Sequence, residues 1–249
     1  MWAIDLERSI SSRFTFDASV TYNNSPAWSP DGRLVAFHQT RSRSDGGPAT
    51  GVYQKASSGK SELLMDGGFT VADWSADGQY LAGYRGTRDV FDVWVMPLAR
   101  DRKPFALMTT RFAEQEPAFS PDVRWIAYSS NESGQWQVFV EPFPATGDKF
   151  QISRNGGRWP TWRSDGKELF FLAPDGTMMA TPLTGQDRFE AGVPQALFPT
   201  SLANQPPGQR HFAVSKDGQR FLINAVQQSA NQRQITVVVN WTALLQQPR

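Results

Sequence analysis

Five segments of the chain repeat one pattern at nearly even spacing. Each carries a bulky apolar residue, a Ser or Arg, one variable residue and then an Asp, which in four segments is followed by Gly. The aspartates lie at intervals of 46, 45, 43 and 52 residues and are Asp31, Asp77, Asp122, Asp165 and Asp217. A period of this length is typical of a propeller blade of four short antiparallel strands. The repeat therefore predicts an all-β chain, a β-propeller with five motif-bearing blades.

The residues around each Asp predict how a blade begins. The Asp-Gly pair favours a tight hairpin turn, because Gly adopts positive φ without strain. A run of consecutive apolar residues follows, for example at 35–37 and 169–171, as a strand buried on both faces requires. In the third repeat Val123 replaces the Gly. Because a β-branched residue resists positive φ, we expect that turn to be of a different type.

The two ends of the chain predict how the ring closes. Residues 1–16 contain two strands of a blade that lacks its first two, and the last strand, from Ile235 to Trp241, lacks a fourth strand beside it. We therefore expect the strand near Phe14 to pair with the strand from Ile235 to Trp241. The chain from 1 to 249 is then a single propeller domain, with motif-bearing blades near 22–66, 69–110, 114–153, 158–200 and 210–245.

Composition and charge exclude several classes of protein. The formal net charge is +1, so no global field attracts nucleic acid or an anionic membrane surface. The absence of Cys excludes disulfides, thiolate metal sites and a cysteine nucleophile. No stretch approaches the roughly 18 apolar residues of a membrane span, and the first residues lack the features of a signal peptide. We expect no nucleic acid partner and no membrane insertion, and we leave the compartment and the oligomeric state open.

The Trp-Ser-Pro-Asp-Gly units resemble the repeats of the TolB-type β-propeller family. Further segments are similar to the propeller domain found C-terminal to some bacterial serine/threonine protein kinases, at 131–134, 141–144, 156–160, 165–169 and 240–245. The resemblance covers nearly the whole chain. It implies a ring of usually six blades, in a domain that senses or binds something. If the domain is part of a longer protein, the resemblance also implies a location outside the cytoplasm. It supplies no catalytic motif.

Polar residues just before the innermost strands are the candidate ligands for a metal ion. In a propeller these positions converge on one mouth of the channel, whereas the Asp turns lie at the opposite end and are expected to be structural. The candidates are Asn24, Asp73, Glu114 and Glu116. They offer hard oxygen ligands of the kind that calcium or magnesium selects, and a bound cation could support hydrolysis of an ester or lactone.

Two other roles compete for the same side chains. Glu114 and Glu116 can instead form ion pairs across the mouth, with Arg111, Arg158 or Arg210 as partners. If the protein is a hydrolase, Glu116 and His211 are the candidate catalytic acid and base. The chain carries no Gly-x-Ser-x-Gly, His-Glu-x-x-His or Gly-x-Gly-x-x-Gly motif.

Three functions stay open, and whether the chain is an enzyme stays open with them. The first is a binding or sensing module that takes a small molecule or peptide at the channel mouth. The exposed aromatic residues Trp2, Trp136 and Trp159 are candidates to stack on a ligand. The second is a hydrolase of lactones or esters, such as acyl-homoserine lactones, that depends on a divalent cation of the calcium type; small propellers with this activity are similar in fold alone. The third is a scaffold for protein contacts.

Overall fold

Each of the five Asp turns joins two antiparallel strands in the structure of the chain, which is a computed structural model. The structure describes residues 1–5, 8, 10–16, 20–42, 47–87, 90–99, 103–184, 189–202, 210–226 and 233–239. All secondary structure elements in these ranges are strands. The described part contains no helix that is long and apolar enough to cross a membrane. The prediction of an all-β chain is thus confirmed.

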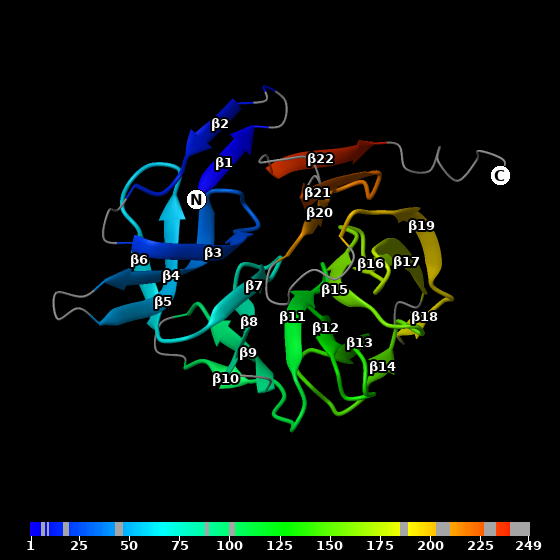
Figure 1. Cartoon of the computed structure of the whole chain (residues 1–249). Coiled ribbons are helices and arrows are strands. Elements are labelled where there is room, and N and C mark those ends of the chain that lie inside the picture. The colour runs from blue at the N-terminus through cyan, green and yellow to red at the C-terminus, as the bar shows by residue number, and fades with distance from the viewer. Residues whose placement is uncertain are drawn as a thin grey trace.

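In the described residues, strands β3 to β22 form five sheets around a common centre, and the first strand of each of these sheets lies innermost (Figure 1). The first sheet consists of β3 (Val20–Trp28), β4 (Leu34–Ser42), β5 (Pro48–Ala56) and β6 (Glu62–Asp66). The second consists of β7 (Thr70–Trp74), β8 (Tyr80–Thr87), β9 (Val90–Pro97) and β10 (Phe105–Ala106). The third consists of β11 (Glu114–Phe119), β12 (Trp125–Ser130), β13 (Gln137–Pro142) and β14 (Phe150–Gln151).

The last two sheets differ in strand number. The fourth consists of β15 (Arg158–Trp162), β16 (Glu168–Leu172), β17 (Thr177–Thr184), β18 (Glu190–Ala191) and β19 (Gln195–Pro199), with β18 and β19 both paired to β17. In the described residues the fifth has three strands, β20 (Phe212–Val214), β21 (Arg220–Val226) and β22 (Arg233–Val239). Five motif-bearing sheets arranged in this way make the fold a propeller.

The apolar runs after the turns are buried on both faces, as the sequence predicts. In β16, Leu169 and Phe171 pack in a cluster with side chains of the third sheet, whereas Phe170 and Leu172 pack in a cluster with side chains of the fifth. Each sheet therefore fills the space between its two neighbours. Burying a Phe or Leu in this way stabilises the folded chain by about 1.5–3 kcal/mol per side chain.

A Ser-Asp pair holds four of the five turns. In the second repeat the Ser75 hydroxyl donates to Asp77 at 2.6 Å and accepts from the Tyr80 amide at 2.9 Å, and the first, third and fifth repeats have the same contacts. In the fourth repeat Arg163 replaces the Ser and binds Asp165 through Nε at 2.6 Å and Nη2 at 2.7 Å. These hydrogen bonds from Arg163 hold the pKa of Asp165 down at about 2. The motif aspartates are thus turn residues, as expected.

The expected change of turn type at Val123 is wrong. Val123 has a φ of 58°, close to that of the Gly residues at the same position, and its amide donates to the Ser120 carbonyl at 2.9 Å as the other turns do. The Ser120–Asp122 hydrogen bond closes the turn, and the valine side chain packs on the cluster that contains Phe119. These contacts offset the strain of a β-branched residue in the left-handed region.

The described residues do not show the predicted closure of the ring by pairing of the end strands. The N-terminal strands β1 (Trp2–Asp5) and β2 (Ile10–Arg13) pair with each other, and in the described residues β22 pairs only with β21. The part of the predicted closing strand beyond Val239 lies outside the described residues. The N-terminal segment packs on a sheet face instead of an edge, because Phe14 is buried against Val35 and Phe37 of the first sheet.

Candidate functional site

Four of the five innermost strands carry β-bulges near the mouth. Their register with the next strand shifts between Asn24 and Ala27, Val71 and Asp73, Gln115 and Ala118, and Arg158 and Thr161. Ser25, Glu116 and Trp159 each lie six residues before a motif Asp and have φ of 53°, 61° and 57°. Such residues are strained at positive φ, and bulges re-aim the side chains they carry. The fold thus places Glu116 and Trp159 at equivalent bulges of neighbouring sheets.

Glu116 is bound in an ion pair with Arg158, one of the two roles that the sequence left open. Arg158 Nη2 lies 2.5 Å from Glu116 Oε1, and Nε lies 3.4 Å from Oε2. Oε2 also accepts from the Ser129 hydroxyl at 2.8 Å and from the Trp159 amide at 3.1 Å. Both side chains are largely buried, with 6% of Glu116 and 12% of Arg158 exposed. The carboxylate is therefore paired and accepts from donors on each oxygen.

Two indole rings flank the guanidinium of Arg158. Its central carbon lies 4.0 Å from the ring centroid of Trp136 and 4.7 Å from that of Trp159. A planar guanidinium stacks well on aromatic rings, and these contacts fix the side chain of Arg158 from both sides. The sequence predicts Arg158 at the mouth and offers Trp136 and Trp159 as exposed rings for a ligand. It does not show that Arg158 would occupy these indole faces.

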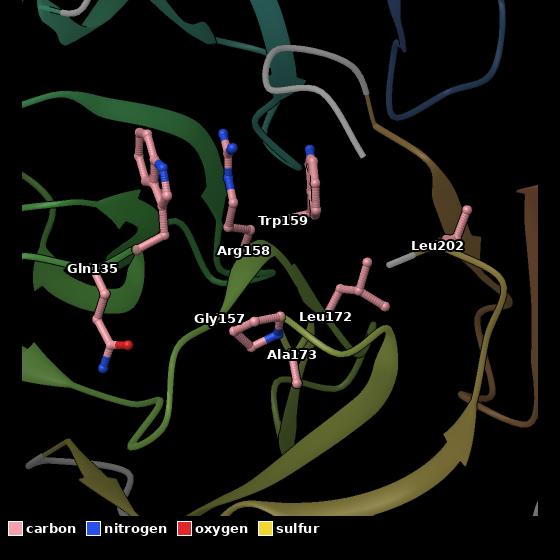
Figure 2. Close-up of a pocket in the computed structure, with 9 residues that line it drawn as sticks. Gln135, Gly157, Arg158, Trp159, Leu172, Ala173 and Leu202 are labelled. Atoms are coloured by element: carbon pink, nitrogen blue, oxygen red, sulfur yellow. The ribbon is translucent and has the colours of Figure 1, made fainter. Parts of the chain in front are cut away.

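These residues border a cavity of about 350 Å³ (Figure 2). It is open to solvent on one side, and its lining comes from the third and fourth sheets and from the segment after β19. The lining residues are mostly apolar: Gln135, Trp136, Gly157, Arg158, Trp159, Leu172, Ala173, Pro174 and Leu202. Trp159 is 5% exposed, and its buried Nε1 has no hydrogen-bond partner in the part of the chain that the structure describes.

His211 lies behind this cavity, against Trp159. The two rings meet edge to face with their centroids 5.1 Å apart, and His211 is buried. Its carbonyl accepts from the Asn224 amide at 2.8 Å. The sequence places His211 at the mouth; in the structure it supports the Trp159 ring and is absent from the cavity lining.

The other predicted metal ligands have separate partners. Asn24 Oδ1 lies 3.1 Å from His38 Nδ1. Asp73 Oδ2 accepts from the Phe119 amide of the next sheet at 2.8 Å, and burial raises the pKa of Asp73 although the Arg210 charge opposes the shift. Asn24 and Asp73 therefore bind different partners.

Glu114 is the most buried of the predicted ligands, with 1% of its surface exposed. Its Oε1 accepts from Thr110 at 2.7 Å and from Ser130 at 3.3 Å, whereas Oε2 has no hydrogen-bond partner among the described residues. Burial raises the pKa of Glu114, and the nearby Asp92 charge adds to the shift. Within the described ranges, no group of three or more His, Asp or Glu side chains is arranged to hold a metal ion.

The apolar half of the cavity was not identified from the sequence. Leu172 ends the apolar strand β16, and Ala173 and Pro174 follow it directly. Their apolar composition is typical of core residues. The signal that could have placed them at the mouth is the Asp175-Gly176 turn that follows, because a second turn after a buried strand marks the loop to the third strand of the blade.

Comparison with known proteins gives the family of the chain and its neighbours in fold. The model of the TolB beta propeller domain family matches residues 24–238. The uncharacterized protein Atu1656 of Agrobacterium fabrum is 28% identical over 169 residues, which cover 64% of this chain and 54% of that protein.

Two solved structures show the same fold at low identity. TolB from Acinetobacter baumannii superposes with a TM-score of 0.71 at 16% identity, covering 96% of this chain and 56% of TolB. The periplasmic gluconolactonase PpgL of Pseudomonas aeruginosa superposes with a TM-score of 0.57 at 14% identity, covering 96% of this chain and 78% of that protein. The chain spans little more than half the length of Atu1656 and of TolB.

Proposed function

The chain belongs to the TolB beta propeller domain family, and we propose that it is a ligand-binding or sensing module whose site is the cavity at the channel mouth. The observation that carries this proposal is the cavity itself. Its volume of about 350 Å³ and its lining of indole and aliphatic side chains with few polar groups are typical of small-molecule sites. Arg158 is held in place by Glu116 and two indoles, so the wall of the site is preorganised.

Hydrolysis of a lactone or ester is the alternative, and the likeness in fold to a gluconolactonase keeps it in view. It requires a group that activates water, either a free carboxylate or imidazole, or a metal ion. Glu116 accepts from Arg158, Ser129 and the Trp159 amide, so both of its oxygens are already engaged by the protein. The geometry therefore favours binding without turnover.

The test is a ligand screen against a variant with a filled cavity. Thermal unfolding of the wild type is measured with pools of peptides, sugars, lactones and other small molecules, together with Ala173→Phe, which places a ring in the cavity. Ala145→Phe is the matched control, because Ala145 is exposed and follows β13 at the opposite end of the third sheet. A ligand at 100 times its Kd stabilises the folded state by about 2.7 kcal/mol.

We expect at least one pool to raise the Tm of the wild type and of Ala145→Phe but not of Ala173→Phe. A ligand that shifts all three proteins equally binds elsewhere and contradicts the proposal. Release of product from lactones or aryl esters, lost on addition of a chelator, would replace it with the metal-dependent hydrolase.

A further inference from the structure

One Asn-Gly pair occurs in the chain, at Asn155 and Gly156. It lies in the connection from β14 to β15, which leads from the outer strand of the third sheet to the innermost strand of the fourth. Asparagine followed by glycine is the pair most prone to spontaneous deamidation, because glycine has no side chain to keep its backbone nitrogen away from the asparagine side chain. The sequence therefore offers one position for this covalent change.

The reaction needs only water. The Gly156 nitrogen loses its proton and attacks the side-chain carbonyl carbon of Asn155, so that a new C–N bond forms and the bond to the side-chain nitrogen breaks. That nitrogen takes up the proton and leaves as ammonia, and a five-membered succinimide remains. Water opens the ring at either carbonyl and gives aspartate or isoaspartate. In isoaspartate the main chain runs through the side chain and is longer by one carbon atom.

The side chain of Asn155 is open to this reaction. Asn155 is exposed and lines a cavity of about 390 Å³ together with Arg154, Pro174 and Asp175. Its side chain makes no hydrogen bond within the described residues. Asn155 is therefore free to turn toward Gly156, and water can reach the product of the attack.

The attacking nitrogen, in contrast, is held by one hydrogen bond. Gly156 is buried, and its N–H donates to Gln137 Oε1 at 3.1 Å. Gln137 is 2% exposed, and its own amide donates to the Arg154 carbonyl at 3.3 Å, so the acceptor is fixed at the start of β13. The proton that must leave before the attack is the proton that Gln137 binds. The hydrogen bond therefore opposes the first step.

Position 155 also lies beside the wall of the mouth cavity. The Gly157 amide donates to the Trp136 carbonyl at 2.9 Å, and a Cβ added at Gly156 would lie 2.5 Å from Pro174 Cγ. Trp136, Gly157 and Pro174 all line the mouth cavity. In a segment packed this closely, an extra backbone atom at position 155 must shift these contacts.

We propose that Asn155 is a site of spontaneous deamidation, that the hydrogen bond from Gly156 to Gln137 slows the reaction in the folded chain, and that isoaspartate at this position loosens the wall of the mouth cavity. The inference goes beyond the proposed function, because it holds whichever ligand the cavity binds.

The first experiment measures the rate of deamidation at Asn155 by peptide mapping and mass spectrometry. The full chain is kept at mildly alkaline pH, either folded or unfolded in urea. We expect Asn155 to react in urea and to react more slowly in the folded chain. No reaction in urea, or equal rates in the two states, overturns the inference, and this comparison needs no variant to fold.

Gln137→Met tests the hydrogen bond, because methionine has a similar length and offers no oxygen to the Gly156 amide. We expect Asn155 to react about three- to tenfold faster in this folded variant than in folded wild type. Gln39→Met is the matched control, since Gln39 is also a buried glutamine and donates to Asn23 at 2.7 Å in the first sheet. It should leave the rate at Asn155 unchanged. No rise in Gln137→Met, or an equal rise in both variants, overturns the role of the hydrogen bond.

The effect on the wall is read by hydrogen exchange of the Gly157 amide. The aged protein that has gained a negative charge is isolated by ion exchange and compared with Asn155→Asp, which gains the same charge without the extra backbone atom. We expect faster exchange of the Gly157 amide in the aged protein than in Asn155→Asp. Equal exchange in the two proteins overturns the effect of isoaspartate on the wall.

Discussion

Replacement of Arg158 by Ala should be among the most destabilising single changes at the mouth. The substitution leaves the Glu116 carboxylate buried, at 6% exposure, without its counter-charge. Removing one partner of a buried ion pair costs about 3–5 kcal/mol, because the other charge stays desolvated. Glu116 keeps its hydrogen bonds from Ser129 and the Trp159 amide, which favours the lower half of that range. Loss of the stacked guanidinium from two indoles adds about 0.5–1 kcal/mol for each ring.

The sum, about 4–6 kcal/mol, is a large part of the stability of a typical domain and corresponds to a fall in Tm of roughly 10 °C or more. The assay is urea unfolding followed by circular dichroism on wild type, Arg158→Ala, Glu116→Gln and the double variant. Glu116→Gln removes the charge that Arg158 leaves behind. The double variant should therefore be more stable than the two single losses predict when they are added.

An exposed ion pair would behave differently. Exposed pairs contribute about 0.2–1 kcal/mol, and their single losses add. A cost below about 1 kcal/mol for Arg158→Ala, with additive single and double variants, would show that the pair is not buried and that the wall of the cavity is not preorganised. Arg158→Lys separates charge from shape, since lysine keeps the charge but not the planar fork.

Three further predictions concern the rest of the chain. Ser75→Ala should lower the free energy of unfolding in urea by about 1–3 kcal/mol, because it leaves the Tyr80 backbone amide without its acceptor. Ser215→Ala, at a half-buried turn, should lower it by less. Equal losses in the two variants would contradict this account of the turns. The raised pKa of Glu114 means that the folded state keeps a proton that the unfolded state loses, so stability should fall as pH rises from the ordinary carboxyl range through the raised pKa. In Glu114→Gln the Tm should no longer fall over this pH range. A pH profile of Tm that equals that of the wild type would contradict the prediction. Deletion of residues 1–16 should cost about 3–5 kcal/mol, because it uncovers Phe37 and the sheet face around it, while a wild-type Tm would show that this packing is dispensable.

Much of the fold follows from local rules that the sequence displays. The Asp turns and the doubly buried strands such as β16 depend on residues adjacent in the chain, so a repeat of similar length reveals them. Val123 shows the limit of such rules, since a turn held by Ser120 and Asp122 tolerates a residue whose own preference opposes it. The packing of Phe14 on a sheet face depends on contacts between distant segments and could not be foreseen from strand counting.

The candidate site, too, could be predicted from the sequence only in part. The sequence places Arg158 at the mouth, because that position follows from strand order. It could not choose between a metal ligand and an ion pair for Glu116, because that choice depends on a bulge that brings Glu116 within 2.5 Å of Arg158, 42 residues further along the chain. Sequence spacing carries no signal for such a contact.

The hydrogen bond from the Phe119 amide to Asp73 is a contact specific to the second and third sheets. The other four repeats carry Ala27, Ala118, Thr161 and Ala213 at the position of Asp73, so none of them offers a carboxylate there. A chimera in which the second blade is replaced by a copy of another repeat would leave the Phe119 amide without this acceptor. The repeats resemble one another in sequence, yet their order in the ring is specific, and engineered duplication or shuffling of blades must transfer the second and third together.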